Sequence, residues 1–242
     1  MNEQTMVISA GAAVASLAFF HTITGPDHYL PFIMIGRARN WSAFKTSMLT
    51  LLCGFGHVFS SILLAAIAIF FGSLLTGIEW IEESRAELAA WMLIAFGFFY
   101  MVWGIKKAYK NRKHKHVHDH GDGHEHEHEH EHEHSHHNTH SHFHVDDKKK
   151  ITPWVLFIVF VLGPCEPMIP LLLAPASQGN VNGVIWVAVI FTAVTLATML
   201  GLVLSSLYGL KKISFKPIEK YSHALAGASI FCCGLAMQFL GL

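Results

Sequence analysis

Two histidines and an aspartate lie close together in an apolar part of the sequence, His21-Thr-Ile-Thr-Gly-Pro-Asp-His28. Imidazole nitrogens and carboxylate oxygens are ligands that suit first-row transition metals. A charged side chain at the bilayer centre costs about 2.5 to 3.5 kcal/mol on insertion scales, so an intramembrane Asp27 indicates a functional site. Gly25 and Pro26 should break the helix here, and membranes tolerate such breaks where they line protein or a cavity.

A second motif, Gly163-Pro164-Cys165-Glu166, combines a helix break with a thiol and a carboxylate. It aligns with Gly25-Pro26-Asp27-His28 in the first half of the chain. Carboxylate, imidazole and thiolate together suit a transition-metal ion, whereas an alkali cation would prefer oxygen ligands alone. We therefore expect Asp27, His28 and Glu166 to form one site, with Cys165 as a further ligand.

The position of His21 leaves two alternatives open. A straight helix would separate His21 from His28 by about 10 Å, too far for one ion at bond lengths of about 2.0 to 2.1 Å. Either the Gly-Pro break shortens this distance, or His21 forms a second station along an ion path. His57 shares a helix face with Cys53, a spacing compatible with chelation. Hydrogen bonding between helices would explain His21 and His57 as well as ligation does.

Six long apolar stretches are expected to position these side chains. The 242-residue chain is 52% hydrophobic and 14% charged, whereas soluble domains contain roughly 25% charged residues. Each stretch reaches about the 20 residues that a helix needs to cross a bilayer, and the strand alternation of a barrel is absent from the sequence. The stretches cover residues 6–35, 44–75, 87–105, 151–175, 181–210 and 221–242.

The two halves of the chain resemble one another. Gly97 aligns with Gly234 and Leu88-Ala89 aligns with Leu225-Ala226 without a gap, and the two Gly-Pro motifs align as well. A repeat with three spans must enter the membrane from opposite sides, as in many secondary transporters. The predicted fold class is an all-α membrane protein of six transmembrane helices, built as two inverted-topology three-helix repeats in which helices 1 and 4 are broken. The predicted repeats are residues 1–110 and 151–242.

Between the repeats, residues 111–150 form a segment rich in histidine and poor in apolar residues. This composition predicts disorder, and a tract that alternates His with Glu is typical of metal binding with little selectivity. An engineered tag is disfavoured because the tract is internal. We expect the segment to collect metal ions through His124, His126, His128, His130, His132, His134, His136 and His137.

Basic residues follow the first, third and fifth apolar stretches, whereas the other connections are acidic or neutral. The positive-inside rule therefore predicts a plasma-membrane protein with both termini outside and the His-rich segment in the cytoplasm. A formal net charge of zero disfavours a nucleic-acid partner. The sequence contains no Gly-rich phosphate-binding motif, so ATP-driven pumping is not expected. The four cysteines fall inside predicted helices, which disfavours a disulfide framework.

These motifs resemble those of the NicO family of nickel and cobalt transporters. The resemblance rests on His21 with Asp27-His28, on Gly-Pro-Cys-Glu at 163–166, on six spans and on the His-rich segment. That segment is most similar to the efflux branch, and the core is also similar to urease-accessory permeases. Nickel/cobalt permeases carry four residues between the His and Asp-His, whereas five, residues 22–26, intervene here.

This resemblance implies a secondary transporter without enzymatic activity, embedded in a lipid bilayer. It would export nickel or cobalt, with zinc as a further candidate, from the cytoplasm. These ions would be transported substrates and not a prosthetic group, and protons are the candidate counter-ion because metal binding and ligand protonation compete. The first alternative is metal uptake for metalloenzyme maturation.

A second resemblance favours a different class of protein. Gly163-Pro-Cys-Glu-Pro-Met-Ile-Pro170 resembles the Pro-Cys segment of membrane thiol-reductant carriers, which pass electrons through one cysteine in each inverted half. Asp27 stands where the first half would need its cysteine, so dithiol exchange lacks an obvious route within the chain. A thiol or electron carrier is therefore the lowest of the three predicted functions.

Overall fold

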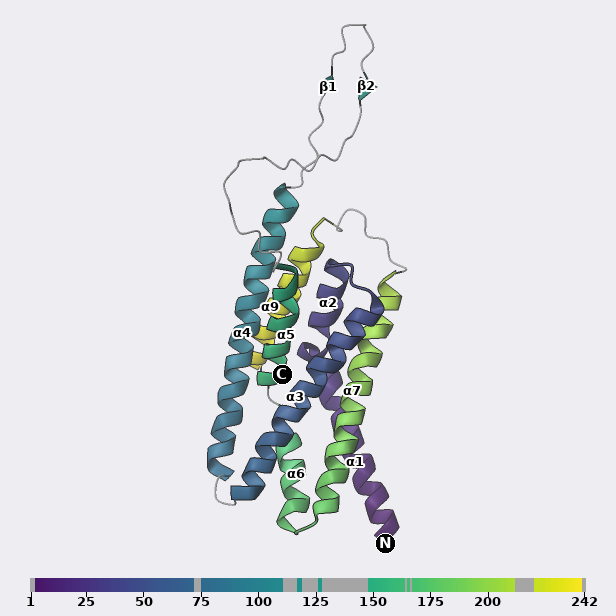
Figure 1. The fold of residues 1–242 in the computed structure, drawn as a ribbon, viewed down its shortest axis with the longest axis vertical. Helices are drawn as coiled ribbons and strands as arrows, with labels where there is room; N and C mark the ends of the chain where they lie inside the picture. Colours follow the sequence, from purple (N-terminus) through teal and green to yellow (C-terminus); the bar gives the residue numbers. More distant parts are fainter. Residues whose placement is uncertain are drawn as a thin grey trace.

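The computed structural model describes residues 3–71, 75–110, 117–118, 126–127, 148–163, 165, 167–211 and 220–240. These residues are helical or lie in short connections, apart from β1 (Val117–His118), which pairs antiparallel with β2 (His126–Glu127). The helices lie side by side in one elongated bundle (Figure 1). The predicted all-α class is confirmed, while the predicted disorder of residues 111–150 falls almost entirely outside the described residues.

Within the described residues, five helices are long and apolar enough to cross a membrane. Two shorter apolar helices and two short segments after the first helix complete the bundle. The chain is therefore a multi-pass membrane protein. The five long helices are α1 (Glu3–Thr24), α3 (Ala43–Phe71), α4 (Leu75–Lys110), α7 (Val181–Lys211) and α9 (Ser222–Leu240). The remaining elements are the 3-10 turn η1 (Pro26–His28), α2 (Leu30–Ala38), α5 (Lys148–Leu162) and α6 (Met168–Ser177).

The first Gly-Pro motif ends α1. The amide of Gly25 still donates to the carbonyl of His21 at 3.1 Å, but Pro26 has no N–H with which to continue the helix. The chain makes one 3-10 turn, in which the amide of His28 donates to the carbonyl of Gly25 at 3.1 Å, and α2 then begins at Leu30. The predicted break in the first helix is present.

The second Gly-Pro motif separates α5 from α6. The amide of Gly163 closes the last turn of α5 by donating to the carbonyl of Val159 at 2.9 Å. The amide of Met168, the first residue of α6, donates to the carbonyl of Cys165 at 2.9 Å. In Figure 1, α1 and α2 run up the bundle whereas α5 and α6 run down it, and both breaks lie well inside its length.

Helices α4 and α9 pack closely through their glycines. A Cβ added to Gly97 would collide with the backbone of Phe231, and one added to Gly234 would lie 2.7 Å from the backbone nitrogen of Ile94. Because the contact partners move backward along α9 as positions advance along α4, the two helices are antiparallel. The absence of side chains at these glycines lets the backbones approach one another, as is common between membrane helices.

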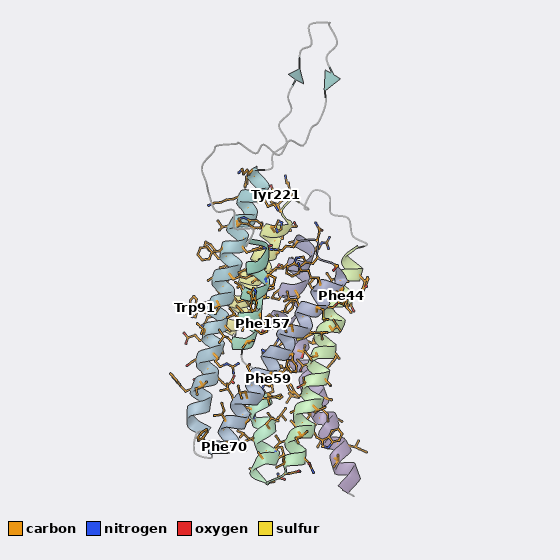
Figure 2. All side chains as sticks on the ribbon, viewed as in Figure 1. Phe44, Phe59, Phe70, Trp91, Phe157 and Tyr221 are labelled. Atoms are coloured by element: carbon orange, nitrogen blue, oxygen red, sulfur yellow. The ribbon has the colours of Figure 1, made fainter. Side chains whose placement is uncertain are left out.

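Large apolar side chains cover the outside of the bundle. Phe44, Phe59, Phe70 and Trp91 come from α3 and α4 and lie at different heights on the bundle (Figure 2). Their exposed fractions run from 49% for Trp91 to 83% for Phe70. Such an exterior would be a liability in water but suits contact with lipid chains.

Candidate functional site

The first break holds Asp27 and His28 as a hydrogen-bonded pair. Nδ1 of His28 lies 3.1 Å from the carbonyl oxygen of Gly25 and 3.2 Å from Oδ1 of Asp27. Both partners are acceptors, so Nδ1 carries the hydrogen and donates it, and Nε2 of the neutral ring keeps its lone pair. The side chains are 5% exposed for His28 and 20% for Asp27. Nε2 of His28 is buried and has no hydrogen-bond partner among the described residues.

Position 25 at this break requires glycine for steric reasons. Its φ of −89° is accessible to any residue, but an added Cβ would lie 2.5 Å from Nδ1 of His28 and 2.9 Å from Oδ1 of Asp27. Any side chain at position 25 would therefore displace the pair.

His57 on α3 reaches the second break. Its Nδ1 lies 3.2 Å from the carbonyl oxygen of Phe160, so Nδ1–H donates and Nε2 again keeps the lone pair. This Nε2 is also buried without a hydrogen-bond partner in the described part of the chain. The ring centroids of His57 and His28 are 5.0 Å apart. Gly163 lies beside the His57 ring, because a Cβ there would be in ordinary van der Waals contact with Nδ1, at 3.4 Å.

His21 and Cys165 complete the cluster. Nε2 of His21 lies 4.0 Å from Sγ of Cys165, and the ring centroids of His21 and His28 are 4.9 Å apart. This separation is shorter than the distance of about 10 Å expected along a straight helix, which favours the first of the two alternatives for His21. One ligand atom each from His21, His57 and Cys165 lies within 4.8 Å of the other two.

A small cavity lies beside the cluster. Asp27, His28, His57 and Gly163 line one part of it, and the remainder of the wall is mostly apolar, formed by Ala89, Leu93, Val159, Phe160 and Met237. The polar groups thus meet a small, largely apolar space in which an electrostatic interaction is stronger than in water.

Not every residue expected at the site can be placed there. Glu166 and Pro164 lie outside the described residues, as do the histidines of the predicted metal-collecting tract other than His126, which is part of β2. Cys53 is buried in an apolar cluster with Leu93 and Met199, and the ligand atoms that lie close to His57 in the described residues are those of His21 and Cys165.

Arg85 is a further residue at the second break that the sequence did not indicate. Residues 79–87 were expected in an acidic connection but belong to α4, where the side chains of Arg85 and Glu82 are only 13% and 10% exposed and form an ion pair. Nη2 of Arg85 donates to the carbonyl of Val161 at 2.9 Å and to that of Gly163 at 3.3 Å. Arg85 therefore satisfies carbonyls that the second break frees. The i,i+3 spacing of Glu82 and Arg85, which makes them neighbours on a helix, is the sequence feature that could have indicated this ion pair.

The fold and the site define a multi-pass membrane protein with a buried cluster of imidazoles, a carboxylate and a thiol between two broken helices. Residues 10–236 match the family described as the cytochrome c biogenesis protein transmembrane region, and the chain belongs to that family. Neither the curated proteins nor the solved structures contain a match to the chain.

This match corrects two predictions. The assignment to the NicO family is wrong, and with it the prediction of nickel or cobalt transport and efflux. Short motifs such as Gly-Pro-Asp-His specify a helix break and a polar group, and these are compatible with more than one family. The match over residues 10–236 extends through almost the whole chain and not only these motifs. It favours the class predicted as least probable, the thiol or electron carriers.

Proposed function

We propose that the protein carries reducing equivalents across the membrane through the thiol of Cys165. The observation that carries this proposal is the family match over residues 10–236 together with a buried cysteine at the second helix break. Cys165 is the residue of this break that thiol-reductant carriers would use, and its side chain is fully buried.

His21 supports thiol chemistry at this position. The thiolate is the nucleophile in disulfide exchange, and a neighbouring base promotes its formation. Nε2 of His21, 4.0 Å from Sγ of Cys165, is placed to accept the thiol proton after a small movement of either side chain.

Asp27 occupies the position of the second cysteine, so the exchange must proceed through mixed disulfides with partner proteins. The Cys165 thiolate attacks an acceptor disulfide, which forms a mixed disulfide and releases one acceptor thiolate. A thiolate of a dithiol donor then attacks the sulfur of Cys165 and releases the second acceptor thiolate. The other donor thiolate closes the donor disulfide and frees Cys165. Two electrons pass from the donor dithiol to the acceptor disulfide.

Access to Cys165 requires movement because its side chain is fully buried. We propose six spans in two inverted repeats, in which α5 and α6 together form the fourth span. The contacts of α4 with α9 support this arrangement: Gly97 meets Phe231 and the aligned Gly234 meets Ile94, which aligns with Phe231. Such a reciprocal pairing is expected around an internal two-fold axis. Rocking of the two halves would open Cys165 to either side.

The orientation follows from the distribution of charge. One end of the bundle holds the connection from α2 to α3, the end of α4 and the beginning of α9, and the other end holds the N-terminus (Figure 1). Arg39, Lys45, Lys107 and Lys110 lie near the first of these ends. We place that end and the His-rich segment in the cytoplasm, with both chain termini outside.

Transfer of reducing equivalents can be measured in vesicles. The purified protein is reconstituted with a thioredoxin-like dithiol protein inside the vesicle and a disulfide-bonded reporter protein outside it. We expect the wild type and Cys232→Ser to reduce the reporter and Cys165→Ser to be inactive. Cys232 is the matched control because it is exposed and lies apart from the cluster. His21→Gln should slow transfer by about 100-fold, the contribution of a general base.

A donor that lacks its second cysteine should accumulate as a mixed disulfide with Cys165, because the final step cannot occur. Reduction of the reporter by Cys165→Ser at the wild-type rate would disprove the proposal.

A further inference from the structure

We infer that His21, His57 and Cys165 also form a binding site for one resident transition-metal ion of the zinc class. The site shares Cys165 with the proposed function but rests on separate observations. Thiolate ligands select zinc and copper(I), and imidazole suits zinc and copper, so the mixed set favours a zinc-like ion over the hard cations that prefer oxygen.

The spacing of the three ligand atoms fits one ion. Zinc bonds of about 2.0 to 2.1 Å to nitrogen and about 2.3 Å to sulfur place tetrahedral ligand atoms about 3.3 to 3.6 Å apart. Sγ of Cys165 and Nε2 of His21 are 4.0 Å apart, and all three ligand atoms lie within 4.8 Å of one another. Side-chain movements of about 1 Å would bring them to bonding distance.

The hydrogen bond of His57 selects the ring form that a metal ligand needs. Metal-bound histidines almost always donate their other ring N–H to a carbonyl or carboxylate, which sets the tautomer and the ring orientation. Nδ1 of His57 makes such a bond to the carbonyl of Phe160, and Nε2 is left buried with its lone pair unused by the described residues. A buried acceptor without a partner is unfavourable, and a metal ion would satisfy it.

His28 repeats this pattern beside the cluster. Its Nδ1 donates to the carboxylate of Asp27, and its buried Nε2 has no partner in the described residues. Its ring centroid lies 4.9 Å from that of His21 and 5.0 Å from that of His57. His28 can thus supply the fourth ligand of a tetrahedral site, with Asp27 as its hydrogen-bonded support.

Metal binding and disulfide exchange compete for Cys165, because a bound metal ion draws electron density from the thiolate sulfur and restricts access to it. A metal ion would therefore hold the cluster in a resting state and protect the thiol from oxidation. Release of the ion would make Cys165 available for exchange.

Co²⁺ is a suitable probe because its bond to a thiolate gives a near-ultraviolet charge-transfer absorption band. The full chain, purified in detergent, is titrated with Co²⁺. The His-rich segment is expected to bind metal ions as well, but it contains no cysteine and cannot give this band. We expect Co²⁺ to produce a saturable band in the wild type and in Cys232→Ser, and no band in Cys165→Ser.

His57→Gln tests the site with the thiol in place, since glutamine retains an N–H for the carbonyl of Phe160. It should abolish the protection of Cys165 by Zn²⁺ against alkylation. Asp27→Asn should weaken Co²⁺ binding by about 10- to 100-fold, the usual effect of losing the support of a metal-bound histidine. Circular dichroism confirms that each variant is folded.

Two results would overturn the metal site: no charge-transfer band in the folded wild type, or a band that persists in Cys165→Ser. Transfer in the vesicle assay without such a band would leave the proposed function standing and remove only the metal site. A band without transfer would retain the metal site and remove the proposed function.

Discussion

Replacing Gly97 with alanine should push α4 and α9 apart. The added Cβ would lie 2.7 Å from Cα of Phe231 and 2.9 Å from the carbonyl carbon of Ile230, and it would meet the amide nitrogen of Phe231 as well. These are backbone atoms, so no side-chain rotation can relieve the clash. Because ordinary contact begins at about 3.4 Å, the helices must separate locally by roughly 0.7 Å or more.

The expected loss of stability combines two opposing effects. Overpacking of this kind costs about 1 to 3 kcal/mol, whereas alanine in place of glycine within a helix contributes about 0.5 to 1 kcal/mol of stability. The net effect is a destabilisation of up to about 2.5 kcal/mol. For a chain of this size it should lower Tm by up to about 10 °C.

Gly201 on α7 is the matched control, because an added Cβ there would meet nothing within 4 Å. Gly201→Ala should raise Tm by about 1 to 4 °C through helix propensity alone. Thermal unfolding in detergent, followed by circular dichroism, measures both variants. In a Cys232→Ser background, Gly97→Ala should also speed the alkylation of Cys233, which is buried on α9. Equal Tm shifts for the two alanine variants would refute the close packing of α4 and α9.

Three further predictions concern the site. Gly25→Ala should displace the ring of His28 by about 1 Å and slow vesicle transfer by about 100-fold; a wild-type rate would mean that this ring position is not needed. Arg85→Met should cost about 3 to 5 kcal/mol, because it leaves Glu82 buried without its counter-charge and removes the donor to Val161 and Gly163. The double variant Arg85→Met/Glu82→Gln should recover part of this loss in thermal unfolding, and no recovery would argue against the ion pair. Zn²⁺ should slow vesicle transfer and a chelator should restore it, whereas an unchanged rate would contradict shared use of Cys165.

The helix breaks could be predicted because they are local. Pro26 has no N–H and sits directly after Gly25, and this pair favours the end of α1 at this point. The membrane class could be predicted for a similar reason, since the length and composition of the apolar stretches decide it. The same reasoning missed Arg85 and Glu82, because a segment that contains several charges reads as a loop until its burial against α5 and α3 is known.

Function could not be predicted correctly from the motifs alone. His21, Asp27 and His28 are good metal ligands, and the sequence interpretation chose metal transport on that basis. The family match over residues 10–236 overturns this choice. A ligand set describes what can bind at a site, whereas the function also depends on how the surrounding helices open and which partners they admit.

By itself, the sequence determined a multi-pass helical membrane protein with polar residues at two Gly-Pro breaks, because backbone chemistry and hydropathy act over a few neighbouring residues. Only the tertiary structure decided that His21, His57 and Cys165 meet. These residues come from α1, from α3 and from the break after α5, and packing between these segments brings their side chains within 4.8 Å of one another. The separation of His21 from His28 depends instead on the local turn at Gly25, whose geometry the sequence left open.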